Sequence, residues 1–288
     1  MIFNSLEFIV FLPIVFLCYW FLIKNNFQLQ NAFVLLSSYI FYGWWDYRFL
    51  ALIAMSTTVD YFIGQSIFNS KKESARKIYL WLSILFNLGL LAFFKYYNFF
   101  IDSWVDFLSN FGFEYQNIWS LKIILPVGIS FYTFQTMSYT LDIYYRNYKP
   151  TKDFISFAAF VSFFPQLVAG PIERAKNLLP QFLSKREFDY AQGVDGLRLI
   201  LWGMFKKVVI ADSLASRVEY SFSFYNVHDG GVLLLGVIFF SFQIYCDFSG
   251  YSDIAIGTSK LFGFELMSNF KFPLIGCLAP SQIRAKSD

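Results

Sequence analysis

Residues Ile78–Phe94 read IYLWLSILFNLGLLAFF and contain no charged side chain. A helix needs about 20 mostly apolar residues to cross the hydrocarbon core of a bilayer, which is roughly 30 Å thick. This stretch nearly reaches that length, and two basic residues, Arg76 and Lys77, directly precede it. The pattern therefore predicts a membrane-spanning helix that begins at a basic membrane surface.

The composition of the whole chain agrees with this prediction. Of its 288 residues, 57% are apolar, 23% are aromatic and only 15% are charged, whereas charged residues make up about a quarter of a soluble domain. Such a composition excludes disordered, collagen-like and polar low-complexity proteins. The net charge of +3 comes without a long basic run, so nucleic acid is not an expected partner. We expect an all-α, polytopic integral membrane protein.

Further stretches are long and apolar enough to be predicted as membrane helices. They are Leu6–Ile23, Leu29–Trp45, Phe49–Phe68, Ile123–Leu141, Gly231–Cys246 and the more weakly apolar Tyr251–Leu266. The first lacks a basic start and a small-residue cleavage site, so we interpret it as a retained helix and not as a signal peptide.

Two basic loops predict the orientation of these helices. Lys and Arg collect in short cytoplasmic loops, which places Lys71–Lys77 in the cytoplasm. Counting helices backwards then puts Met1 outside, and counting forwards puts the acidic stretch Tyr96–Ser120 outside. The next helix brings a second basic loop, Arg146–Lys152, to the cytoplasm, so both loops agree with one topology.

The uncharged stretch Phe154–Ile172 does not fit a simple crossing, because basic residues lie on both sides of it. It contains Pro165, Gly170 and Pro171, which interrupt a helix and leave backbone groups that protein or water must satisfy. A re-entrant segment that enters and leaves from the cytoplasm explains both observations. A kinked but ordinary membrane helix is the alternative.

The stretch Leu197–Val218 is predicted to be helical but carries Lys206 and Lys207 within its apolar pattern. Charges in the middle of a bilayer are costly. We interpret the stretch as an interfacial helix whose lysines extend towards water. A helix that faces a polar cavity is the alternative.

Two clusters of polar residues lie in apolar surroundings and are candidate site residues. The first consists of Gln135, Tyr139 and Asp142, and the second of Gln243, Tyr245, Asp247, Ser249, Tyr251 and Asp253. A carboxylate at membrane depth needs a partner or a water-filled cavity, which makes it a functional candidate. The alternative is that these groups only join neighbouring helices, or cap a helix break at Gly250.

The remaining chemistry-bearing residues are sparse. The single histidine, His228, lies in the turn-like segment Asn226–Gly231 and is predicted to be external. It is therefore a poor candidate for a general base, and Ser249 has no histidine near it in sequence. The cysteines at 18, 246 and 277 lack the spacing of a zinc or disulfide framework. No phosphate-binding or dinucleotide glycine motif is present, and we expect no metal site.

Several strings resemble a known family. They are Met1–Ser5 (MIFNS), Phe41–Trp45 (FYGWW), Lys95–Phe100 (KYYNFF), Leu125–Gln135 (LPVGISFYTFQ), Phe163–Ile172 (FFPQLVAGPI) and Tyr245–Asp253 (YCDFSGYSD). They are similar to strings of the membrane-bound O-acyltransferases, and most of all to the bacterial alginate O-acetyltransferase type. The resemblance runs from Met1 to about Pro273.

The resemblance implies a ring of helices around a funnel in the bacterial inner membrane. It implies transfer of an acyl group, usually acetyl, from a cytoplasmic donor such as acetyl-CoA or an acyl carrier. The acceptor would be an exported polysaccharide such as alginate, reached directly or through an extracytoplasmic acyl-relay protein. Membrane lipid would surround the chain, and no bound cofactor is expected. The funnel would be lined by the two polar clusters and by Pro165, Gln166, Gly170 and Pro171.

The sequence departs from the family after Asn269–Pro273. In the family, a stretch rich in Trp and Arg with one histidine follows, and the catalytic histidine lies in a later helix. Here Leu274–Asp288 contains no aromatic residue, which would occur by chance about 2% of the time at this composition. We interpret 1–273 as the N-terminal part of the acyltransferase domain and 274–288 as an aberrant or truncated tail.

This departure leaves three classes of function open. The chain could be an O-acyltransferase whose catalytic histidine is missing from it, so that no catalytic residue can be named. It could be a non-catalytic remnant or a membrane interaction partner. It could also be a transporter that uses buried carboxylates as proton relays, although a transporter should show paired internal repeats, and none is visible between the two halves.

Overall fold

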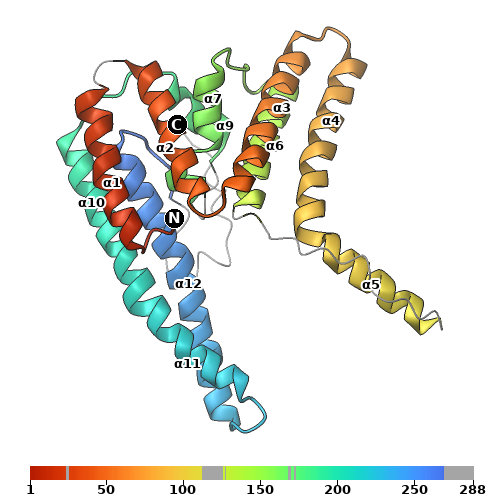
Figure 1. The fold of residues 1–288 in the computed structure, drawn as a ribbon, viewed down its shortest axis with the longest axis vertical. Coiled ribbons are helices and arrows are strands. Elements are labelled where there is room, and N and C mark those ends of the chain that lie inside the picture. Colours follow the sequence, from red (N-terminus) through yellow and green to blue (C-terminus); the bar gives the residue numbers. More distant parts are fainter. Residues whose placement is uncertain (24–25, 112–125, 127, 168–169, 172, 269–288) are drawn as a thin grey trace, which may run out of the picture.

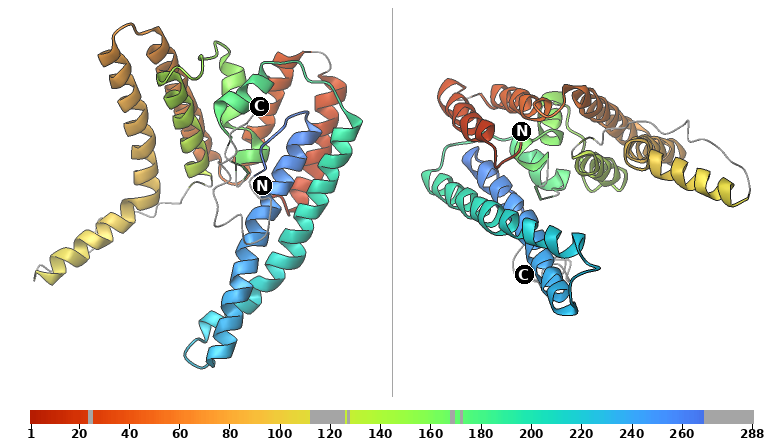
Figure 2. Two further views of the ribbon diagram at one scale, coloured as in Figure 1. Left: turned by 180° about the vertical axis from the view of Figure 1, so that it is seen from behind. Right: turned by 60° about the horizontal axis from the view of Figure 1, so that its bottom comes forward.

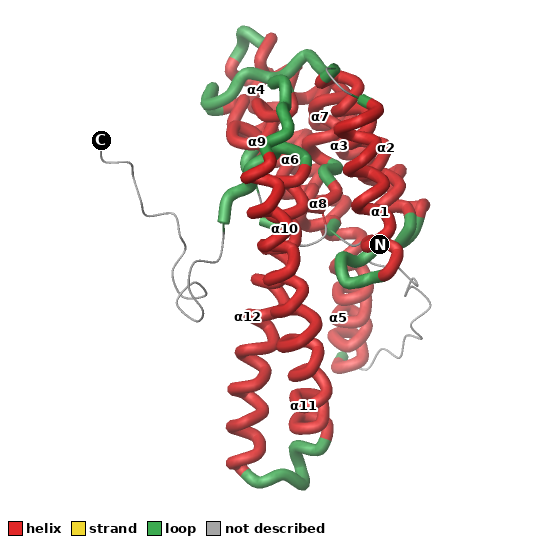
Figure 3. Tube along the Cα trace, turned by 90° about the vertical axis from the view of Figure 1, so that its left-hand side faces the viewer, coloured by secondary structure: helices red, strands yellow, loops and turns green. Residues whose placement is uncertain are grey.

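A computed structural model describes residues 1–23, 26–111, 126, 128–167, 170–171 and 173–268. These residues form helices and loops without any strand (Figures 1 and 3), as the composition predicted. The elements are α1 (Leu6–Leu17), the π-helix η1 (Cys18–Leu22), α2 (Phe27–Gly43), the 3₁₀ turn η2 (Tyr47–Phe49), α3 (Leu50–Asn69), α4 (Glu73–Leu91), the π-helix η3 (Ala92–Tyr96), α5 (Tyr97–Asn110), α6 (Ile129–Tyr144), α7 (Phe154–Val161), α8 (Phe164–Leu167), α9 (Ala175–Phe182), α10 (Tyr190–Met204), the π-helix η4 (Phe205–Ala211), α11 (Asp212–Ser223) and α12 (Gly230–Leu261).

Within the described part of the chain, three continuous helices are long and apolar enough to cross a membrane. They are Tyr47–Asn69, Glu73–Asn110 and Gly230–Leu261. Shorter apolar helices cover Leu6–Leu22 and Phe154–Leu167. Large apolar side chains are exposed along these elements, as expected for surfaces that face lipid. The polytopic, all-α membrane class is thereby confirmed.

The helices form two groups joined by a short-helix layer (Figure 2). The long pair made by α10–η4–α11 and α12 lies beside α1, while α3, α4 and α6 pack together on the other side. The short helices α7, α8 and α9 lie between the two groups and contact α2, α3, α6 and α12. Helix α5 continues α4 away from both groups and has no buried residue (Figure 1).

Aromatic rings fill the space between α1, α2, α8 and the end of α12. The ring of Phe164 lies 5.5 Å from those of Phe11 and Phe41, and 5.8 Å from that of Phe262, measured between centroids. Lipid tails are as apolar as these side chains, so membrane helices associate through close packing and not through the hydrophobic effect. The tilted and edge-on ring contacts supply such packing.

The structure corrects two predictions about the last third of the chain. Gly231–Cys246 and Tyr251–Leu266 are not separate helices, because α12 runs without a break through Gly250. Leu197–Val218 is not a helix that lies flat at an interface, because α10–η4–α11 packs lengthwise and antiparallel to α12 (Figure 3). Both errors have one cause, the close contact between these two long helices that is described below.

The two basic loops lie at the same end of the molecule. A cavity of about 260 Å³ is lined by Arg76 from the start of α4 and by Arg146 and Lys149 from the loop after α6. A guanidinium nitrogen of Arg76 donates to the backbone oxygen of Tyr144. This arrangement agrees with the topology inferred from charge, and the cytoplasmic assignment of this end stays a prediction.

The segment predicted to be re-entrant reverses direction. Helix α7 leads to the short helix α8, and α9 returns to the end where α7 began, so that Asn31 Nδ2 donates both to Ser156 Oγ (2.8 Å) and to the backbone oxygen of Phe182 (2.6 Å). Ser156 lies in the first turn of α7, and Phe182 is the last residue of α9. The start of α7 and the end of α9 therefore lie together, and the re-entrant placement of the segment stays a prediction. Its depth in a bilayer and the surrounding funnel stay predictions.

Candidate functional site

Four charged side chains from the long helix pair meet in what we call the charged centre: Lys206, Lys207, Asp247 and Asp253. Lys206 Nζ lies 2.5 Å from Asp253 Oδ2, and Lys207 Nζ lies 2.6 Å from Asp247 Oδ1. Lys207 also pairs with Asp212 at 3.0 Å. The Lys206 side chain is only 9% exposed and that of Asp253 18%. The carboxylates of the second polar cluster therefore have cationic partners.

Gly250 explains how two consecutive lysines reach two carboxylates. It lies midway between Asp247 and Asp253 on α12, and an added Cβ there would come 2.9 Å from the backbone oxygen of Gly203 and 3.2 Å from the backbone nitrogen of Lys207. The backbone of η4 therefore lies directly against Gly250, and one ammonium group extends to each side of it. The π-helical turn adds a residue to this part of the helix, a feature that is frequent at functional sites.

A second glycine pair repeats this contact: Gly196 lies seven residues before Gly203 on α10, and Gly257 lies seven residues after Gly250 on α12. An added Cβ at Gly196 would come 2.7 Å from the backbone oxygen of Gly257, and one at Gly203 would come 2.6 Å from that of Gly250. Small residues at such positions let two membrane helices approach backbone to backbone. The glycine pairs therefore fix the register that brings the charged centre together.

The other members of the second cluster lie on the same continuous helix, α12, and not on two separate helices. Ser249 is fully buried, and its hydroxyl makes no hydrogen bond to any described residue. Tyr251 stacks on Phe3, with 5.5 Å between ring centroids, and lies 5.8 Å from Lys207 Nζ. Gln243 and Tyr245 are half-buried towards the start of α12. His228 lies just before the first residue of α12, with its ring tilted against that of Tyr220, so it is too far along the helix to serve Ser249.

The first cluster lies on α6 and is buried in the protein. Gln135 Nε2 donates to the backbone oxygen of Phe160 in α7 (3.0 Å). Tyr139 packs on Phe157, with 4.5 Å between ring centroids. Asp142 lies in the last turn of α6, and its backbone oxygen accepts from the amides that follow the helix. Gln135 and Tyr139 therefore attach α6 to α7, while Asp142 holds the loop that follows α6.

The breaker residues of the returning segment are also buried. Pro165 and Gln166 belong to α8, and Gly170 donates its backbone N–H to the backbone oxygen of Gln166 (3.0 Å). Pro171 follows in the buried backbone. Among the described residues, no hydrogen bond or ion pair joins this segment or α6 to the charged centre, so the structure gives no single site that contains all the predicted residues.

A third polar group was not among the predicted site residues. The fully buried Asp60 of α3 accepts from Ser83 Oγ (2.6 Å) and from Asn87 Nδ2 (2.7 Å) of α4. Ser83 in turn contacts Thr140 Oγ1 of α6 at 3.1 Å. The spacing of Ser83 and Asn87, one helical turn apart, is the signal that could have revealed a shared polar face.

Replacing Asp60 is expected to lower the stability of the folded protein. Asp60→Leu removes one hydrogen bond each from the Ser83 hydroxyl and the Asn87 amide, which keep Thr140 Oγ1 and the backbone oxygen of Ser83 as partners, and each lost hydrogen bond costs about 1 kcal/mol. We expect the midpoint of thermal unfolding in detergent to fall clearly for Asp60→Leu and less for Asp60→Asn, which keeps one amide oxygen. Equal midpoints for Asp60→Leu and the parent chain would contradict a stabilising role.

Metal coordination has no support among the residues that the structure describes, because they contain no group of three or more His, Cys, Asp or Glu side chains that could hold an ion. The fold and the charged centre define a helical membrane protein that holds ion-paired carboxylates between two long helices. No protein-family model matches the chain. Individual relatives identify it further.

The chain is 40% identical to a probable alginate O-acetylase of Pseudomonas aeruginosa over 277 residues, which are 96% of this chain and 52% of that protein. It is 40% identical to the Pseudomonas putida protein of the same name, over 96% of this chain and 56% of that protein. A peptidoglycan O-acetyltransferase of Helicobacter pylori is 34% identical, over 95% and 56%. The predicted resemblance to membrane-bound O-acyltransferases of the alginate O-acetyltransferase type is confirmed, and the chain spans about half the length of these relatives.

Proposed function

We propose that this chain is part of a membrane O-acetyltransferase that acts on an exported polysaccharide and works in the bacterial inner membrane. The observation that carries the proposal is the similarity along 96% of the chain to proteins named alginate O-acetylase. The similarity to a peptidoglycan O-acetyltransferase supports an acceptor in the wider class of cell-surface glycans. Alginate is the acceptor we propose first, with acetyl-CoA or an acyl carrier as donor.

In such a reaction a sugar hydroxyl attacks the carbonyl carbon of an acyl thioester, the C–O bond forms, and the thiolate leaves. A general base takes the hydroxyl proton, which contributes about 10²–10⁴ in rate. His228, the histidine among the described residues, lies far along α12 from the charged centre. It is therefore not assigned as the general base. We propose that the charged centre positions the long helix pair, and that the base lies outside the described residues.

The proposal competes with two others. A proton-relay transporter would use the carboxylates of the charged centre, but the relatives named above are acyl-transferring proteins. A non-catalytic membrane protein stays an alternative for this polypeptide. The experiment below separates this alternative from the enzyme.

The test measures acetyl ester on surface polysaccharide in a strain deleted for the gene. The strain receives either this chain or the chain extended through the downstream reading frame. Restored ester with either version supports the proposal, and restoration by the extended version alone assigns the base to the added residues. No ester with either version, with both proteins present in the membrane, would overturn it.

The same assay tests the charged centre. In the version that restores ester, Asp247→Ala and Asp247→Asn are expected to lower ester content about 10- to 100-fold, because loss of this pair lets Lys207 and η4 shift, and small misplacements have effects of this size. Arg198→Gln is the matched control, since Arg198 lies on α10 but its side chain is 78% exposed. Unchanged ester for the Asp247 variants at normal protein level would exclude a role in transfer.

A further inference from the structure

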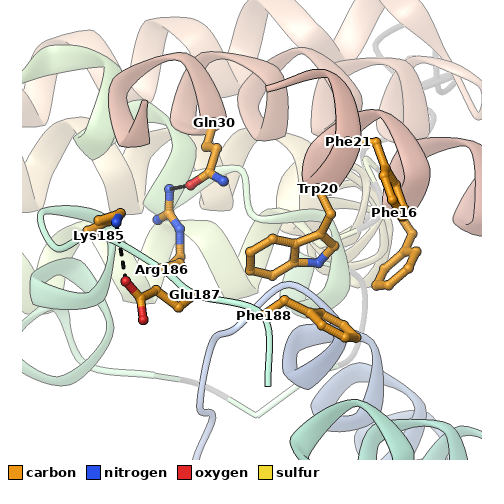
Figure 4. Close-up of a pocket in the computed structure, with 8 residues that line it drawn as sticks. All are labelled: Phe16, Trp20, Phe21, Gln30, Lys185, Arg186, Glu187 and Phe188. Atoms are coloured by element: carbon orange, nitrogen blue, oxygen red, sulfur yellow. Dashed lines mark hydrogen bonds and ion pairs between the residues drawn. The ribbon is translucent and has the colours of Figure 1, made fainter. Parts of the chain in front are cut away.

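A cavity separate from the charged centre opens between η1, α2 and the loop that leads to α10. Its volume is about 520 Å³, which is within the usual range of small-molecule sites. Figure 4 shows its lining residues, in which aromatic rings occupy one part and charged or polar side chains the other. The lining consists of Phe16, Trp20, Phe21, Gln30, Lys185, Arg186, Glu187 and Phe188.

Arg186 is the residue that distinguishes this cavity. Its side chain is buried, with 6% of the residue exposed. One terminal nitrogen donates to Asn31 Oδ1 (2.7 Å) and to Gln30 Oε1 (3.3 Å), and the other donates to the backbone oxygen of Gln181 (3.3 Å). The third guanidinium nitrogen, Nε, has no hydrogen-bond partner among the described residues.

No described carboxylate pairs with Arg186, whose guanidinium lies over the rings of Tyr19, Phe182 and Phe264 at 5.8, 5.9 and 4.7 Å from their centroids. All its acceptors are neutral, and no ion pair joins it to a described carboxylate. The one acidic residue of the lining, Glu187, pairs instead with the exposed Lys185 at 3.2 Å. Burial lowers the pKa of the Arg186 guanidinium, because desolvation disfavours its charged form. A buried charge without a counter-charge is costly, and an anion in the cavity would remove that cost.

The aromatic part of the cavity is held rigidly. Trp20 Nε1 donates to the backbone oxygen of Leu261 (2.9 Å), which fixes the orientation of the indole. Phe188 lies edge-on to both Trp20 and Phe16, with ring centroids 5.4 Å and 5.9 Å away. A rigid apolar wall next to a cationic end suits a ligand that is anionic at one end and apolar at the other.

We propose that this cavity binds a phosphate ester, with the phosphate near Arg186 and Lys185 and the adjoining apolar group against Trp20, Phe16 and Phe188. A guanidinium binds phosphate oxygens in charge-assisted hydrogen bonds. The phosphate can come from an anionic membrane lipid or from a water-soluble ester. The proposal does not depend on the acyl-transfer activity.

The test uses the full chain in nanodiscs and measures the midpoint of thermal unfolding, which rises when a ligand binds the folded state. One arm compares phosphatidylcholine discs with discs that also contain phosphatidylglycerol. The other arm adds phenyl phosphate to phosphatidylcholine discs. A rise only with phosphatidylglycerol assigns the lipid source, and a rise with phenyl phosphate assigns the soluble source. No rise in either arm would overturn the proposal.

Substitutions of lining residues test whether the phosphate ester binds in this cavity. Arg186→Gln keeps hydrogen-bonding capacity but loses the charge, and we expect its apparent affinity to fall at least tenfold. Lys185→Gln and Phe188→Ala change exposed side chains, so they test the cavity even if the Arg186 variant does not fold. Each should lower the apparent affinity about threefold or more. Arg198→Gln removes one positive charge elsewhere and should bind like the parent chain. Equal affinities for all these variants would also overturn the proposal.

Discussion

Gly203→Ala is expected to destabilise the protein by about 2–3 kcal/mol, although alanine is the better helix former. The added Cβ would lie 2.6 Å from the backbone oxygen of Gly250 and 2.7 Å from Ile254 Cγ1. The backbone oxygen of Gly250 and the backbone nitrogen of Ile254, 3.0 Å from the added Cβ, cannot move away without separating α10 from α12. The measurement is the midpoint of thermal unfolding in detergent, combined with the fraction of protein that remains monodisperse after extraction.

A matched control separates the steric effect of the added Cβ from the effect of a glycine-to-alanine change on helix propensity. Gly89 lies inside α4, and no atom lies within 4 Å of an added Cβ there. Gly89→Ala should therefore be neutral or gain up to about 1 kcal/mol from helix propensity. If both alanine variants unfold at the same temperature, close backbone packing does not hold the long helix pair together.

Lys206→Met is expected to cost about 3 kcal/mol, because it leaves the carboxylate of Asp253 without its partner in a mostly buried position. Asp253→Leu should cost a similar amount for the opposite reason. The double variant Lys206→Met with Asp253→Leu replaces the ion pair by two apolar side chains, and it should recover most of the loss. Thermal unfolding of the four proteins gives the coupling free energy of the pair.

Arg198 and Asp195 provide the control for this cycle. They form an ion pair at 3.6 Å on the exposed face of α10, with side chains 78% and 58% exposed. Exposed pairs contribute little to stability, so Arg198→Met should change the midpoint only slightly. Additive losses for Lys206→Met and Asp253→Leu would show that the two charges do not interact and would contradict the geometry of the charged centre.

Residue patterns in the sequence predicted the class of helical membrane proteins and part of the candidate functional site. Uncharged stretches such as Ile78–Phe94 identified membrane helices because the bilayer imposes one length and one polarity on any crossing segment. The basic flanks and prolines of Phe154–Ile172 predicted an interrupted helix, and the chain does reverse there through α8. The string Tyr245–Asp253 identified the acidic half of the charged centre.

The lysine half was assigned to the wrong environment. Lys206 and Lys207 look like interfacial residues when their helix is considered alone, since nothing local shows what faces them. Their partners lie about 40 residues away along the chain, on α12. The helix break at Gly250, considered as an alternative, is absent for the same reason: α12 is continuous there, and packing against Gly203 makes glycine favourable inside a helix where its intrinsic propensity is poor.

By itself, the sequence determined that this protein is a helical membrane protein related to O-acyltransferases, because apolar length, basic loops and family strings are properties of short segments. Only the tertiary structure decided which polar groups meet. Asp60 with Ser83 and Asn87, Lys206 with Asp253, and the neutral partners of buried Arg186 are contacts between different elements. Such contacts depend on helix register and backbone approach, which no single segment specifies.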